Sequence, residues 1–476
     1  AAYIFICLVP IAESALGFFA LSLGLYALTA VFALLLGGRL CAASVLALIF
    51  GCIVSGYRFI NGSAAYYFPV FILSALCYAF FTVTLFGNHS AALGGRFLLD
   101  LVKGVAYQVI SFIDFFRDLF RPEGAKRGSR AVLTVILALV IAFVLLVIVG
   151  SLLSYDPRFA QMMPKLDVDT ILEFILKLHL AVPIGAMIYG LAASSRARKL
   201  SGLSTEASAR AASERLRFLP VVVIAVSVAA LLVMYVLFFI SQWGYYMSAF
   251  TKELPSGYSA AEYAREGFFQ LLAVACINAL LLLVLRCFTK TQTKAAKVVS
   301  TVLSALLCAA TLILIATAIS KMALYIDMYD LTRDRLCATL FLVFLAVAFV
   351  LTFVSLFVPK MKLLPVVIGV GLVMLTVFML SGSDKLIADY NAESYLSGKH
   401  DNIDVNYIAG ELNCSGTAAL IRLEKEAGDE AVRQKAKELL DAETAAFKQN
   451  PLPWYQRSIP YYIEQKLLQE RKGAGN

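Results

Sequence analysis

Three polar segments lie between long apolar runs, at 155–160, 258–271 and 323–335. Their charged and tyrosine side chains include Asp156, Glu262, Arg265, Tyr325, Asp327, Asp330, Arg333 and Arg335. Arginine pairs with carboxylates in a bidentate way, and the same groups recognise polar ligands. Two interpretations follow: ion pairs and tyrosine anchors that fix helix ends, or a recognition cleft covered by the C-terminal segment.

A second set of candidates lies inside the apolar runs. Glu173 and Lys177 are spaced i, i+4 and can pair on one helix face, and Asn278 lies near the middle of its run. Polar groups at membrane depth are functional candidates because burying them is costly. The plainer interpretation is a structural ion pair and an interhelical hydrogen bond; the sharper one is a transport pathway.

Metal and cofactor chemistry is not expected. His89, His179 and His400 have no partner at ligand spacing, so a zinc or haem site is not predicted. The Gly369-Val-Gly371 run lies in an apolar stretch without a preceding strand, which excludes a nucleotide-binding fingerprint. Only Cys414 among nine cysteines lies away from the apolar runs, so no disulfide framework is predicted.

Membrane helices must position these residues. The 476-residue chain is 61% hydrophobic and 15% charged, with mean hydropathy +0.81, which excludes a soluble globular protein. An all-α, polytopic protein follows, with the lipid bilayer as its surroundings. About ten spans are predicted, at 15–37, 40–58, 66–86, 131–153, 171–193, 218–240, 267–287, 298–319, 335–357 and 363–381. Residues 1–12 are either the remnant of a further helix or a half-buried segment.

Loop charge predicts the orientation. Sixteen Lys and Arg residues fall in the loops of one side and seven in the alternate loops, and basic residues collect on the cytoplasmic side. This places the segment after residue 381 outside the cytoplasm, in a cytoplasmic-membrane protein. Because the net charge of +9 comes from these loops, it gives no support to a nucleic-acid partner.

Residues 97–120 carry a polar stripe on an otherwise apolar helix. Asp100, Lys103, Tyr107 and Ser111 recur at steps of three or four. The pattern predicts an amphipathic helix lying in the cytoplasmic interface and docked against the protein. The alternative is a further span whose stripe faces the bundle.

The domain prediction is a transmembrane domain, 1–381, followed by a small extracytoplasmic helical domain, 382–476. Apolar residues recur at helical spacing in 417–426 and 429–447, Pro451 and Pro453 end the second run, and a last amphipathic piece covers 460–471.

The polar segments resemble a bacterial family of polytopic membrane proteins, the domain-of-unknown-function family four-one-seven-three, with its relative four-one-five-three. The Ala-Glu-Tyr-Ala-Arg run at 261–265 and Gly-Phe-Phe at 267–269 are the most specific part, and Asp389-Tyr-Asn391 and Asp404-Val-Asn-Tyr407 fit as well. Asp330 departs from the family pattern, in which Gly is common. The resemblance implies the fold but supplies no activity.

The function predicted from the sequence is a non-enzymatic envelope component that binds or senses an envelope protein or small ligand at its outer face. One alternative is a secondary transporter that uses Glu173, Lys177 and Asn278. Another is an enzyme acting on a lipid-linked substrate, for which Glu262, Asp327 and Asp330 are the candidate carboxylates.

Overall fold

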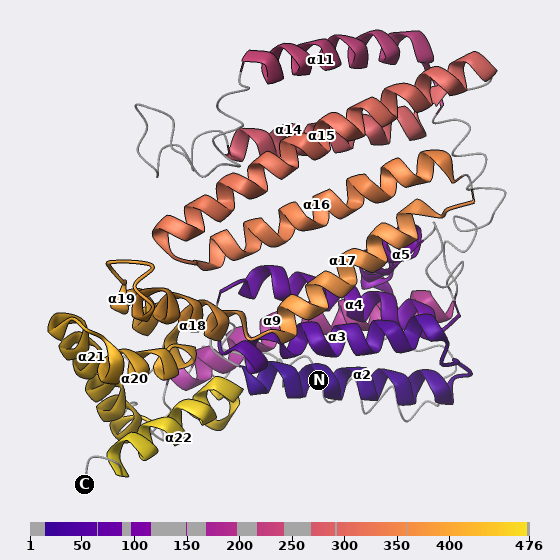
Figure 1. Ribbon diagram of the computed structural model, residues 1–476. Helices are drawn as coiled ribbons and strands as arrows, with labels where there is room; N and C mark the ends of the chain where they lie inside the picture. Colours follow the sequence, from indigo (N-terminus) through magenta and orange to yellow (C-terminus); the bar gives the residue numbers. More distant parts are fainter. Residues whose placement is uncertain are drawn as a thin grey trace, which may run out of the picture.

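The computed structural model describes residues 15–63, 65–87, 97–115, 149, 168–197, 217–241, 268–290, 293–358 and 360–473 (Figure 1). Within these ranges it gives no side chains for 97–99, 168–176 and 178–180. The predictions for residues 1–12, for Asp156, Glu262 and Arg265, and for nearly all of the span at 131–153 lie outside the described residues.

The first helix group is built from the N-terminal part of the chain. It contains α2 (Leu16–Leu35), α3 (Ala42–Asn61), α4 (Tyr67–Leu85), α5 (Phe97–Ile110) and α9 (Val168–Arg196). Their shared core includes Tyr26, Phe81, Tyr107 and Leu191. The helices approach closely where side chains are small: a Cβ added at Gly104 would lie 3.1 Å from the Ala79 side chain.

The second helix group follows in the chain. It contains α11 (Val221–Ser241), α14 (Phe268–Cys287), α15 (Lys294–Tyr329) and α16 (Arg333–Phe357) around a separate apolar core. Two two-residue strands, β1 (Leu219–Pro220) and β2 (Thr289–Lys290), pair in parallel beside α11 and α14. Helix α17 (Leu363–Leu380) packs on both α3 and α16, so it joins the two groups (Figure 1).

Eight of the described helices are long and apolar enough to cross a membrane: α2, α3, α4, α11, α14, α15, α16 and α17. They coincide with eight of the predicted spans, and the prediction of an all-α polytopic membrane protein is confirmed. Residues 171–193 lie within α9, a 29-residue helix with Pro183 in its interior. Helix α15, at 36 residues, is about 54 Å long, so it extends well beyond a hydrocarbon core of about 30 Å.

Helix α5 turns its polar stripe toward the protein. Asp100, Lys103, Tyr107 and Ser111 are all buried, and Nζ of Lys103 donates to Oδ1 of Asp100 at 3.1 Å. The stripe packs against α4 and α9, and apolar residues such as Val105 are exposed on the opposite side. The interfacial position of this helix stays a prediction.

Residues 383–473, called the tail below, form helices gathered at one end of the long helices (Figure 1). They are α18 (Ser383–Leu396), α19 (Val405–Gly410), the 3-10 turn η2 (Asn413–Ser415), α20 (Thr417–Glu426), α21 (Glu430–Gln449), the 3-10 turn η3 (Trp454–Gln456) and α22 (Ile459–Gly473). Ile408, Leu420 and Leu440 belong to the tail core, and Leu331 of the bundle packs into it. Side-chain caps at Asp404 and Asp429 begin α19 and α21.

Candidate functional site

The turn between α15 and α16 presents the polar residues predicted from segment 323–335. Asp330 ends α15 with a φ of 65° and a ψ of 170°, a backbone conformation that favours glycine. Thr332 then begins α16, since its side chain accepts from the Arg335 N–H. Glycine adopts the Asp330 conformation without steric cost, so the aspartate here carries backbone strain.

Arg333 makes the strongest contact between this turn and the tail. Its Nε and Nη2 donate to the two carboxylate oxygens of Asp384 at 2.8 and 2.7 Å. Asp384 is buried and the Arg333 side chain is 15% exposed. The same guanidinium also binds the Glu411 carbonyl and lies 3.5 Å from its carboxylate. A bidentate pair of this kind fixes both distance and orientation between α16 and α18.

Asn391 of α18 binds the turn through its side-chain amide. The Leu331 N–H donates to Oδ1 of Asn391 at 2.8 Å, and Nδ2 of Asn391 donates to the Leu331 carbonyl at 2.9 Å. Both residues are buried. The amide thus satisfies both backbone groups of a turn residue that has no helical partner for them.

Lys399 and His400, just after α18, bind Asp327 in the last turns of α15 and Asp330 at its end. Lys399 donates to Asp327 at 2.7 Å, and this hydrogen bond raises the pKa of the lysine. His400 places Nδ1 against the Asp330 carboxylate and Nε2 2.6 Å from the Asp327 carbonyl. Both ring nitrogens of His400 therefore lie at hydrogen-bond distance from an oxygen of the bundle.

Arg335 and Tyr325 lie on the turn itself. The Arg335 guanidinium stacks over the Tyr325 ring, 4.1 Å from its centroid, and donates to the carbonyls of Tyr329 and Asp330. This arrangement holds the end of α15 against the start of α16.

A second connection runs from α3 to the tail through the buried Asn61. Its Nδ2 donates to the Met379 carbonyl at 2.7 Å, and its Oδ1 accepts from the Ser383 N–H at 3.1 Å. The Asn61 carbonyl accepts from the Ser415 hydroxyl at 3.2 Å. One residue thus ties the end of α3 to the end of α17, to the start of α18 and to η2.

We call these contacts the bundle–tail junction: Asp327, Asp330, Leu331, Arg333 and Asn61 on the bundle, with Asp384, Asn391, Lys399, His400, Glu411 and Ser415 on the tail. Arg333 of the 323–335 segment thus pairs with Asp384 of the tail. Contacts of Asn61, Asn391, Lys399 and His400 across the junction were not predicted from the sequence. Asn391 belongs to the Asp389-Tyr-Asn391 motif, which supports the family resemblance. For Asn61, the only indication in the sequence is its position near the end of a predicted span.

Asn278 makes interhelical hydrogen bonds, the plainer of its two interpretations. The Tyr235 hydroxyl of α11 donates to Oδ1 of Asn278 at 2.8 Å, and Nδ2 donates to the Thr311 hydroxyl of α15 at 2.9 Å. All three residues are buried. Lys177 is half-buried on α9, and the Glu173 side chain lies outside the described residues.

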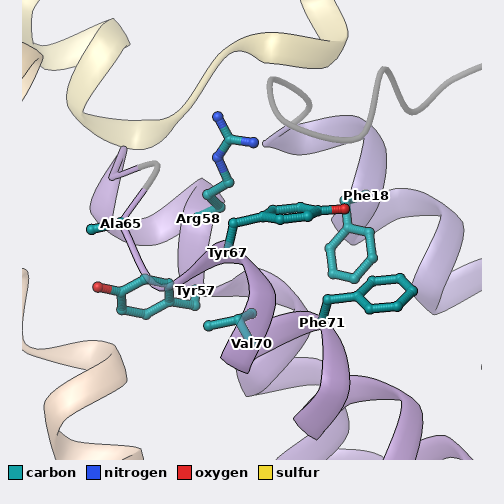
Figure 2. A pocket seen from close by; sticks show the side chains of 7 residues that line it. All are labelled: Phe18, Tyr57, Arg58, Ala65, Tyr67, Val70 and Phe71. Atoms are coloured by element: carbon teal, nitrogen blue, oxygen red, sulfur yellow. The ribbon is translucent and has the colours of Figure 1, made fainter.

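A small hollow lies where α2, α3 and α4 come together near the tail (Figure 2). It is lined by Phe18, Tyr57, Arg58, Ala65, Tyr67, Val70 and Phe71. Figure 2 shows the Tyr67 ring between Arg58 and Phe18, and the Arg58 guanidinium carbon lies 6.0 Å from that ring's centroid. The hollow holds about one water molecule, too little for an organic ligand.

Two carboxyl groups face each other inside the tail. Glu443 of α21 lies beside Glu464 of α22, whose Oε1 accepts from the Thr417 hydroxyl at 3.2 Å. Burial, followed by the charge of Glu464, raises the pKa of Glu443 to about 8. Burial also raises the pKa of Glu464. The pair therefore holds a shared proton at neutral pH.

Within the part of the chain that the structure describes, no group of three His, Cys, Asp or Glu side chains is arranged to hold a metal ion. The junction joins two parts of one chain through three kinds of contact. These are a buried bidentate ion pair, a side-chain amide that bonds both backbone groups of a turn residue, and a histidine that lies between two oxygens.

Comparison with known proteins gives one family. No curated protein and no solved structure matches the chain. The family model of a domain of unknown function, DUF4153, matches residues 1–423. The matching model is thus that of family four-one-five-three, the relative, and not that of family four-one-seven-three. The match ends inside α20, so both sides of the junction fall within it. The chain belongs to the DUF4153 family.

Proposed function

We propose that this multi-pass protein is a non-enzymatic component of the cell envelope, and that its tail, held outside the cytoplasm, binds a protein or small ligand there. The bundle–tail junction carries the proposal. The tail is fixed to the membrane helices by side-chain contacts of Asp327, Asp330 and Arg333. A tail fixed in this way presents one constant surface beside the membrane.

Contacts at the junction bear on the enzyme alternative, and contacts within the bundle bear on the transporter alternative. Asp327 and Asp330 are engaged by Lys399 and His400, so neither carboxylate is poised toward an open groove. Asn278 has both ends of its amide bound to neighbouring helices, which leaves it without the coordination that a transported solute would need. We therefore take binding by the tail as the function.

The experiment is photo-crosslinking in living cells. A photoreactive residue replaces Glu438, exposed on α21, or Lys466, exposed on α22. We expect a discrete crosslinked product at one of these positions, and its loss when Arg333→Ala detaches the tail at unchanged protein abundance. Arg422→Ala, which breaks an exposed ion pair inside the tail, is the matched control. Crosslinks that persist unchanged in Arg333→Ala would show that the junction has no part in binding.

A further inference from the structure

Residues 451–463 differ in composition from the rest of the tail. The segment reads Pro-Leu-Pro-Trp-Tyr-Gln-Arg-Ser-Ile-Pro-Tyr-Tyr-Ile, with four aromatic residues and Arg457 as its single charge. The helices before it, α20 and α21, carry charges throughout. A water-facing connection would not need this concentration of aromatic and aliphatic side chains.

The segment lies level with the ends of the membrane helices. A Cβ added at Gly62, directly after α3, would lie 3.1 Å from Oγ of Ser458 and 3.2 Å from the Pro460 ring. Turn η3 packs against α2. The neighbouring Asn61 binds the last turn of α17 at Met379. Contacts with two candidate spans, α2 and α3, therefore place 451–463 beside the membrane helices, and Asn61 links this end of α3 to the end of α17.

Five apolar or aromatic side chains of the segment point outward, whereas the Tyr461 ring is buried. Exposed fractions are 37% for Leu452, 53% for Trp454, 40% for Ile459, 43% for Tyr462 and 49% for Ile463. One turn further along α22 the exposed residues become polar, with Lys466, Gln469 and Glu470. The exposed face of this helix thus changes from apolar to polar as it leaves the bundle.

Arg457 is turned back onto its own segment. Its Nε donates to the Leu452 carbonyl at 2.9 Å, and its guanidinium lies 5.8 Å from the centroid of the Tyr461 ring. The charge is therefore satisfied locally and does not interrupt the apolar surface formed by the neighbouring side chains.

We propose that residues 451–463 form an interfacial anchor that inserts Trp454, Ile459, Tyr462 and Ile463 into the headgroup region of the bilayer. Trp and Tyr concentrate at this depth because an apolar ring meets lipid while its N–H or O–H meets water. Helix α2, at 20 residues, is about 30 Å long, so its ends lie at the hydrocarbon boundary. The neighbouring segment then meets lipid headgroups, and this holds whichever side of the membrane the tail occupies.

Tryptophan fluorescence tests the anchor directly, because the chain has two tryptophans. The Trp243→Phe variant, full-length and reconstituted in phosphatidylcholine nanodiscs, reports Trp454 alone. We expect blue-shifted emission, with stronger quenching by lipids brominated near the glycerol end of the acyl chain than by lipids brominated near its methyl end. The Trp454→Phe variant reports the emission of Trp243 alone. If Trp243→Phe fails to fold, subtracting the Trp454→Phe spectrum from that of the unaltered protein gives the emission of Trp454.

Two results would overturn the proposal. Red-shifted emission that aqueous acrylamide quenches and brominated lipid does not would place Trp454 in water. Blue-shifted emission that neither agent quenches would show that protein, such as a second copy of this chain, covers the segment.

Discussion

Asn61 shows how much one side chain can connect. Its amide binds Met379 and Ser383, and its backbone carbonyl binds Ser415, so three elements meet at one buried residue. No composition or periodicity marks it, because its partners lie more than 300 positions away in sequence. This is why the contact could not be predicted from the sequence, whereas Asp327, Asp330 and Arg333 of the same junction are candidates because of their charge and spacing.

We expect Asn61→Ala to lower the free energy of unfolding by about 2–4 kcal/mol, because it leaves a buried carbonyl and a buried N–H without partners. Thermal unfolding in detergent measures the loss. The control is Asn406→Ala, which changes an exposed asparagine of α19. Equal stability of the two variants would contradict the role given to Asn61.

Asp330 has a strained backbone conformation, and its side chain contacts His400 of the tail. Asp330→Gly and Asp330→Ala both remove the contact with His400, but only glycine adopts the observed φ of 65° without strain. We therefore expect the alanine variant to be less stable than the glycine variant by about 1–3 kcal/mol. Thermal unfolding of the two variants side by side checks this. An alanine variant as stable as the glycine variant would mean that the turn carries no strain.

At the scale of the element, most helices of the membrane part were predictable, because each needs about 20 apolar residues in sequence. Helices α20, α21 and α22 of the tail were predictable too, from apolar spacing and from the prolines that end α21, whereas α18 and α19 were not predicted. What the sequence does not reveal is which helices touch. The contact of α17 with both α3 and α16, for example, depends on side-chain shapes along all three helices.

The ion pair between α16 and α18 gives an element-scale prediction. Arg333→Ala leaves the buried Asp384 carboxylate unpaired, and we expect a loss of about 3–5 kcal/mol of stability. Replacing both residues, as Arg333→Met with Asp384→Leu, should cost less than the single change, because no buried charge remains. Thermal unfolding of the single, double and Arg422→Ala control variants gives the comparison. A double variant as unstable as Arg333→Ala would contradict a buried-charge penalty.

The paired carboxyls of α21 and α22 predict a pH dependence. The pKa of Glu443 is raised in the folded state above its ordinary value of 4.5, so the folded tail holds a proton that the unfolded chain releases. Stability should therefore fall as pH rises from about 4.5 toward 8, by at most about 1.4 kcal/mol per pH unit. Unfolding of the full-length protein measured across this range checks the slope.

Glu443→Gln should flatten that pH profile and raise stability near pH 8, because the amide needs no proton to stay neutral. Glu438→Gln on the exposed face of α21 is the matched control and should leave the profile unchanged. A profile that keeps its slope in Glu443→Gln would assign the pH dependence to other groups.

At the scale of the whole molecule, the two helix groups and the tail meet at one end of the long helices. The alternation of spans predicted from loop charge places the start of α4, the end of α3, the turn from α15 to α16 and the end of α17 on the same side. In the structure these ends do lie together, since Cys337 of α16 binds Tyr66 before α4, and Asn61 binds Met379. The side of the membrane they face is the prediction on which the proposed function depends.

Cysteine labelling in intact cells tests that claim most directly. Asn402→Cys lies in an exposed stretch of the tail, and Ser208→Cys lies in the basic segment after α9. With a membrane-impermeant maleimide, we expect Asn402→Cys to react in intact cells and Ser208→Cys to react only after the membrane is permeabilised. Labelling of Ser208→Cys in intact cells, with Asn402→Cys protected, would place the tail in the cytoplasm and contradict the account.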